Sequence, residues 1–182
     1  DMDYVVRFQG GNNAGHTIIH GGRTLKLHLI PSGIMYRHIT PVIGNGVVVD
    51  PVVMLAEIDG LEARGVDCSR LRVSGNAHLI LPYHQAIDVM IERYLGKNKL
   101  GTTKRGIGPS YGDKASRRGL RMGDLLDADV FSVLLEDRME EYNRILSALG
   151  AEALPFRKIL AEYQAAARFL KPYIADTIVL LN

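Results

Sequence analysis

Short β-prone runs dominate the first half of this 182-residue chain, and helical patterns dominate the second. Residues 3–8 are expected to form a strand, and the runs 17–20 and 23–29 flank Gly21-Gly22 as a hairpin does. Residues 42–49 are expected to form one buried strand with a bend. Residues 71–73 and 78–81 are expected to be short extended pieces.

Capping residues and prolines mark the helices. Asp50 followed by Pro51 predicts a helix that runs to about Arg64, because Asp is a good N-cap and Pro suits the first helical position. Further helices are expected at residues 82–95, 127–149 and 155–170, with a last helical piece after Pro172. The pattern predicts an α/β fold: a mixed, largely parallel sheet with a hairpin and flanking helices, and a helical second half.

The long helix at residues 127–149 is expected to bury one apolar stripe. The residues placed near that stripe are Val130, Val133, Leu134, Met139, Tyr142, Ile145, Leu146 and Leu149.

Composition removes several classes of protein. Hydrophobic residues make up 47% and charged residues 23%, which excludes a disordered tail, a collagen-like fibre and a coiled coil. The single cysteine, Cys68, excludes a disulfide scaffold and a zinc ribbon, and it favours a reducing cytoplasm. No run of about 18 apolar residues is present, so no membrane span is expected.

Positive charge is concentrated in residues 97–121, which hold eight cations, five glycines and one acid, Asp113. This basic segment has a net charge of +7 in a chain whose total is +2. Glycine backbone N–H groups beside cations can surround an anion, and the hydroxyls of Thr102 and Thr103 suit a phosphate monoester. A solvated basic loop without a ligand explains the composition equally well. The segment is neither a Walker A loop nor a dinucleotide-binding fingerprint.

A second glycine-rich loop, residues 9–17, follows the first expected strand and reads Gln-Gly-Gly-Asn-Asn-Ala-Gly-His-Thr. Asn amides both donate and accept hydrogen bonds, and a histidine can act as a general acid or bind an anion near neutral pH. Taken alone, the loop reads as a tight turn with a surface histidine.

Together the two segments resemble the adenylosuccinate synthetase family, GTP-dependent enzymes that join IMP to L-aspartate. The family pattern G-I-G-P-x-Y-x-x-K-x-x-R is present at residues 106–117, and residues 10–17 also match. Residues 28–34 and 43–48 match in the same order. The resemblance is collinear over essentially all 182 residues, strongest before Arg121.

The resemblance implies roles for three residues at the end of the first loop. His16 would be the catalytic histidine that helps to transfer the γ-phosphoryl group of GTP to O6 of IMP. The carbonyl of Gly15 would bind Mg²⁺, and Thr17 would begin a mobile loop that closes over GTP and aspartate.

The resemblance also implies an IMP site. Asn13 would contact IMP, Thr103 would hold the IMP phosphate, and Arg105 would be a further polar contact near the substrate site. Arg117 would reach the IMP phosphate in the partner subunit of a homodimer.

The family's Q-W-G-D-E-G-K-G loop, which supplies the general base, and its later substrate-binding segments are not among these residues. Residues 1–182 are therefore expected to be a single domain, a truncated part of a larger synthetase domain, inactive as an isolated chain. Two alternatives remain open: a nucleic-acid-binding module built on the basic segment, and a non-catalytic dimerisation relic.

Overall fold

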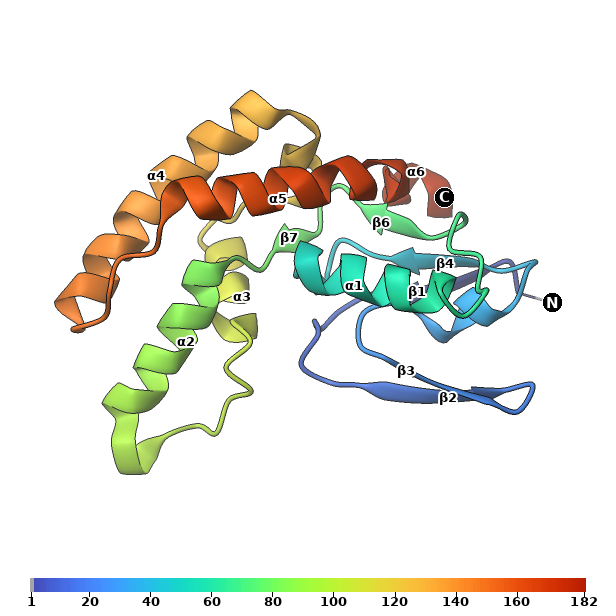
Figure 1. Ribbon diagram of the computed structural model, residues 1–182, viewed down its shortest axis with the longest axis horizontal. Helices are drawn as coiled ribbons and strands as arrows, with labels where there is room; N and C mark the ends of the chain where they lie inside the picture. Colours follow the sequence, from blue (N-terminus) through green and yellow to red (C-terminus); the bar gives the residue numbers. More distant parts are fainter. Residues whose placement is uncertain (1) are drawn as a thin grey trace.

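A parallel four-stranded sheet forms one end of the molecule (Figure 1). The computed structural model describes residues 2–182, apart from the side chains of His20 and Arg23. The strand order is β1 (Tyr4–Arg7), β4 (Thr40–Ile43), β6 (Arg72–Ser74) and β8 (Ile174–Ala175), and each neighbouring pair is parallel. The expected α/β class with a largely parallel sheet is confirmed.

The predicted hairpin is also present. Strands β2 (His16–His20) and β3 (Arg23–Leu27) pair antiparallel, with residues 20 and 23 opposite each other across Gly21-Gly22.

The prediction of a single bent strand at residues 42–49 is wrong. Strand β4 ends at Ile43, and β5 (Val48–Val49) pairs instead with β7 (His78–Leu79) in a separate two-stranded sheet. The intervening Gly44-Asn45-Gly46 therefore transfers the chain between two sheets rather than bending one strand.

Most of the predicted helices form within a few residues of their expected bounds. They are α1 (Pro51–Glu62), α2 (Pro82–Leu95), α4 (Ala128–Ala148) and α5 (Phe156–Leu170). Asp50 caps α1 by accepting hydrogen bonds from the N–H groups of Val52 and Val53 at 3.1 and 3.2 Å. After Pro172 the chain does not form one helical piece, because β8 intervenes before the short helix α6 (Thr177–Leu181).

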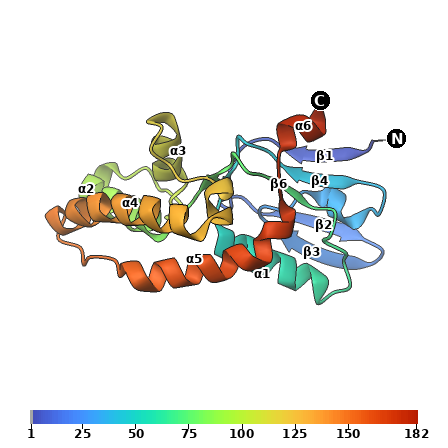
Figure 2. The same ribbon diagram turned by 90° about the horizontal axis from the view of Figure 1, so that it is seen from above.

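The basic segment contains a helix that the sequence did not suggest. Helix α3 (Ile107–Ala115) follows Gly106, which is its N-cap residue, and packs against α2. In Figure 2, α2, α3 and α4 lie at the end away from the sheet, and α5 runs from that end towards the sheet.

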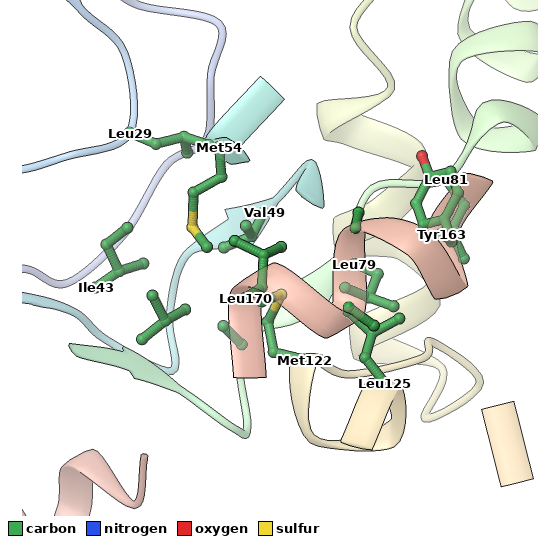
Figure 3. Packing of buried hydrophobic residues seen from close by; sticks show 14 of the residues in the cluster. Leu29, Ile43, Val49, Met54, Leu79, Leu81, Met122, Leu125, Tyr163 and Leu170 are labelled. Atoms are coloured by element: carbon green, nitrogen blue, oxygen red, sulfur yellow. The ribbon is translucent and has the colours of Figure 1, made fainter. Parts of the chain in front are cut away.

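The hydrophobic core lies where α1, α5 and the two parallel sheets meet (Figure 3). Leu170 of α5 sits beside Met54 of α1, Val49 of β5 and Met122, and all four side chains are fully buried. No helix in residues 2–182 is long and apolar enough to span a membrane.

The predicted stripe of α4 mixes two faces of that helix. Met139, Tyr142 and Leu146 are buried as expected, but the buried face continues through Phe131 and Leu135. The other members of the predicted stripe are exposed: Val130, Val133, Leu134, Ile145 and Leu149. Apolar residues occur on both faces, so periodicity alone did not identify the buried one.

Candidate active site

The glycine-rich loop at residues 9–17, named here the first loop, contacts α3 and the residues just before it. The guanidinium of Arg105 donates to the carbonyl of Asn12. The hydroxyl of Tyr111 accepts from the Gly10 N–H at 2.9 Å and donates to the Gly46 carbonyl at 2.7 Å. Segments about 100 residues apart in the sequence therefore meet at one place.

Close packing tightens this junction. A Cβ atom at Gly11 would lie 2.6 Å from Cδ1 of Ile107, the first residue of α3. A larger residue at this position would therefore require the Ile107 side chain to move.

Arg7 of β1 fixes the first loop through hydrogen bonds, a role that the sequence did not suggest. Its guanidinium donates to the Gly11 carbonyl at 2.6 Å and also to the carbonyl of His28. In the sequence, Arg7 is marked only as a single cation at the end of the first strand.

Glu57 of α1 fixes the segment that follows the hairpin. Its carboxylate accepts hydrogen bonds from the N–H groups of Leu29 and Ile30 at 2.9 and 3.0 Å, and from that of His28. Glu57 and Arg7 therefore hold residues 28–30 next to the first loop. Sequence reading did not single out Glu57 either.

His16 lies at the start of β2 and lines a pocket of about 390 Å³ with Gln9, Ala14 and Gly15. Burial lowers the pKa of His16 below its ordinary value of 6.5, and the nearby charge of Arg7 lowers it further, against a smaller opposing effect of Glu57. The imidazole is therefore neutral at pH 7, with one nitrogen that donates and one that accepts.

Magnesium ligands are scarce around this pocket. Within residues 2–182 no group of three or more His, Cys, Asp or Glu side chains could hold a metal ion. The predicted Mg²⁺ ligand in this pocket, the carbonyl of Gly15, is a single protein oxygen, and Mg²⁺ commonly completes its shell with water and substrate phosphates.

Residues 99–106, named here the second loop, lead into α3. Thr103 is exposed at its middle, whereas the hydroxyl of Thr102 donates to Asp88 at 2.7 Å. Arg105 is half-buried through its contact with the first loop.

Several cations of the basic segment have internal partners. Lys114 donates to the Asn45 carbonyl at 2.5 Å, Arg121 to Asn76 at 3.3 Å, and Arg118 forms an ion pair with Glu141. The segment is therefore not an open loop of free positive charge.

Arg117 differs from these cations. It is exposed, adopts a left-handed backbone with φ of 62°, and makes no side-chain hydrogen bond or ion pair with any described residue. It lies two residues beyond the end of α3, whose nine residues span about 13 Å at about 1.5 Å per residue, whereas Ile107 is at the other end of this helix.

The structure thus brings together only part of the predicted set. Gly15 and His16 share a pocket, and Arg105 joins the second loop to the first. Asn13 and Thr17 are exposed in the first loop and at the start of β2, and Thr103 is exposed in the second loop. Arg117 makes no hydrogen bond or ion pair with any of them.

A buried polar cluster behind α3 was also missed. Asp113 accepts hydrogen bonds from the Tyr142 hydroxyl at 2.7 Å and from Nε2 of His84 at 3.1 Å. The N–H of Leu81 donates to Nδ1 of His84 at 3.0 Å, so the ring proton is assigned to Nε2. The three side chains come from α2, α3 and α4, and no local motif connects them.

The protonation states of this cluster follow from its geometry. Burial lowers the pKa of His84 more strongly than Asp113 raises it, so the imidazole is neutral. Burial alone would raise the pKa of Asp113, but the hydrogen bonds from His84 and Tyr142 together hold it below 3.8. The cluster therefore carries one negative charge and locks α3 onto its neighbours.

Comparisons with known proteins identify the family of this chain. The family model described as Adenylosuccinate synthetase matches residues 1–182. The chain is 54% identical over its whole length to adenylosuccinate synthetase of Frankia casuarinae and 51% identical to that of Thermobifida fusca. It spans about 43% of the length of each of these curated relatives.

A solved structure shows the same fold. The chain aligns over 99% of its length with fully ligated adenylosuccinate synthetase from Plasmodium falciparum, at 34% identity and a TM-score of 0.88. The aligned part is 42% of that chain.

Proposed function

The chain belongs to the adenylosuccinate synthetase family, and from this premise we propose that it carries part of the site that converts GTP, IMP and L-aspartate to adenylosuccinate. The observation that carries the proposal is the junction of the two loops. The contacts of Arg105 with Asn12 and of Tyr111 with Gly10 join the loop that bears His16 to the loop that bears Thr103.

The proposed reaction has two steps. The γ-phosphoryl group of GTP moves to O6 of IMP, which forms 6-phosphoryl-IMP and releases GDP. The amine of aspartate then attacks C6, and inorganic phosphate leaves with O6. The first step is needed because an unmodified O6 is a poor leaving group.

His16 is the proposed catalytic residue. Phosphoryl transfer depends on positioning and on stabilising the charge of the transferring group. A neutral imidazole can donate one hydrogen bond to that group without a net charge, and the lowered pKa of His16 keeps it in this form. Magnesium, with the Gly15 carbonyl as one ligand, would neutralise phosphate charge when bound.

Asn13 and Thr103 are the proposed contacts of IMP within one subunit, and Arg105 is proposed as a further substrate contact. Thr103 offers an exposed hydroxyl and Asn13 an exposed amide, and both suit a nucleotide. Thr17, the second residue of β2, is proposed as a further substrate contact. We also propose a cytoplasmic setting, in which the lone, buried Cys68 stays reduced.

The test uses the complete gene product that contains this chain. His16→Asn should lower kcat by about 100-fold or more, as the loss of a transition-state donor does, while Kd for GTP and IMP changes less than about threefold. The matched control is His38→Asn, because His38 is exposed and lies outside both loops. A variant at His16 with normal turnover would exclude this residue as the catalytic group.

The nucleic-acid alternative makes a different prediction, namely polynucleotide binding that weakens steeply with salt. No observation favours it, because Lys114, Arg118 and Arg121 already have partners within the fold.

A further inference from the structure

Two acidic side chains of α2, Asp88 and Glu92, lie one helical turn apart and face the second loop. They are only 5% and 6% exposed, and neither forms an ion pair with a described residue. A buried carboxylate without a cation is costly unless hydrogen bonds satisfy its oxygens. The role of these two carboxylates can therefore be inferred from the groups that donate hydrogen bonds to them.

All four carboxylate oxygens accept hydrogen bonds from the second loop. Glu92 accepts from the N–H groups of Leu100 and Gly101, each at 2.9 Å. Asp88 accepts from the Thr102 hydroxyl at 2.7 Å and from the Gly106 N–H at 3.0 Å. The contacts are spread along the loop from residue 100 to residue 106.

The second loop needs such external support. Gly101, Lys104 and Gly106 all have positive φ, at 74°, 57° and 74°. A left-handed lysine persists only where its surroundings hold it there. Thr103 and Arg105 lie on either side of Lys104, so their positions depend on this backbone.

We propose that Asp88 and Glu92 are positioning residues for the phosphate of IMP. By fixing the backbone of the second loop before substrate arrives, they place the hydroxyl of Thr103 for the phosphate monoester. Preorganisation of this kind raises the affinity for IMP because the loop loses less conformational entropy on binding. The inference rests on the proposed function.

The same contacts restrict how the phosphate is bound. The N–H groups of Leu100, Gly101 and Gly106 already donate to carboxylates, so they are not free to donate to an anion. The phosphate is therefore held by side chains of the second loop rather than by these backbone groups, in contrast to what its glycine content suggested.

The experiment measures steady-state kinetics of the complete gene product with Asp88→Asn and Glu92→Gln. Each amide presents an NH₂ group to a donor of the loop and loses a hydrogen bond. KM for IMP should rise about tenfold or more, which is the size of one lost hydrogen bond to a charged group. KM for GTP should stay within about twofold and kcat within about threefold, because only uniform binding of IMP is lost.

Glu136→Gln is the matched control, since Glu136 is an exposed acid on α4. Thr102→Val is the gentler second variant, because it removes one donor to Asp88 and leaves both carboxylates in place. It should also raise KM for IMP, and it decides the question if either amide variant does not fold.

A double-mutant cycle separates positioning from general stability. Thr103→Val combined with Glu92→Gln should raise KM for IMP by less than the product of the single effects, because both act through one contact. An equal rise of KM for all substrates, or a fully multiplicative cycle, would reduce Glu92 to a structural residue and overturn the inference.

Two failures can be told apart. If the wild-type protein makes no adenylosuccinate, the proposed function fails and the inference fails with it. If the wild type is active and Thr103→Val raises KM for IMP, while the variants at Asp88, Glu92 and Thr102 leave KM unchanged, only the positioning role is wrong.

Discussion

His78 and His84 show that the charge of a residue in this fold depends on its surroundings. Burial lowers the pKa of His78 to about 4, helped by the positive charges of Lys114 and Arg121. Burial also lowers the pKa of His84, whose Nδ1 accepts from a backbone N–H. Both imidazoles are neutral at pH 7. In acid the unfolded chain takes up protons at these residues before the folded chain does, so the free energy of unfolding falls.

The first prediction is loss of stability in mild acid. The pKa of His78 is about 6.5 when unfolded and about 4 when folded, so between these values the unfolded chain binds a proton that the folded chain does not. Stability should therefore fall as the pH drops from about 6.5 to 4, by as much as about 3 kcal/mol from His78 alone.

Urea denaturation at several pH values from 7 to 4 checks this. His78→Gln cannot take up the proton and should flatten the decline, although its stability at pH 7 is lower. Equal slopes for the wild type and the variant would contradict the prediction. His38→Gln, at an exposed position, should keep the wild-type slope.

At the scale of elements, α3 forms despite a poor helical sequence. Its nine residues include two glycines and a proline. Pro109 is tolerated because it lies in the first turn, where no N–H is needed for the helix. Tertiary contacts supply the rest, since Tyr111, Asp113 and Lys114 each bond to another part of the fold.

Two glycines near the start of α3 should respond in opposite ways to alanine. Gly106 has φ of 74°, and a Cβ there would lie 2.8 Å from the backbone nitrogen of Gln85. Gly106→Ala should therefore cost more than about 2 kcal/mol, since a left-handed alanine alone costs about 1–2. Gly108 has open space around it, so Gly108→Ala should gain up to about 1 kcal/mol.

Urea denaturation of both variants measures the difference directly. An equal effect at the two positions would show that the close approach of Gly106 to α2 is not present in solution.

At the scale of the whole molecule, the isolation of Arg117 has a consequence for assembly. No contact joins it to the two loops in the described residues, and its backbone is left-handed. The family resemblance predicts that Arg117 completes the site of a second subunit in a homodimer, and its exposed guanidinium is available for such a contact.

Mixing two inactive variants of the complete protein tests this. Arg117→Leu should raise KM for IMP by orders of magnitude, and His16→Asn should lower kcat. If Arg117 acts in the partner's site, a mixed dimer holds one intact site, and an equal mixture should recover about a quarter of wild-type activity. No recovery, with exchange of subunits verified by mass, would place Arg117 in the site of its own subunit.

The sequence by itself determined the features that are encoded within a few consecutive residues. The cap at Asp50, the turn at Gly21-Gly22 and the helices α2 and α5 formed as predicted, because each depends on local backbone preferences. Its motifs also identified the family, and the roles carried over to His16, Asn13, Thr103, Arg105 and Arg117 stay predictions.

Only the tertiary structure decided what depends on partners far along the chain. It divided residues 42–49 between two sheets, made a helix of a glycine-rich segment, and selected the buried face of α4. It also revealed Asp88 and Glu92 beneath the second loop. The reason is physical: a hydrogen bond or a packed side chain has no local signature when its partner lies in a different element of the fold.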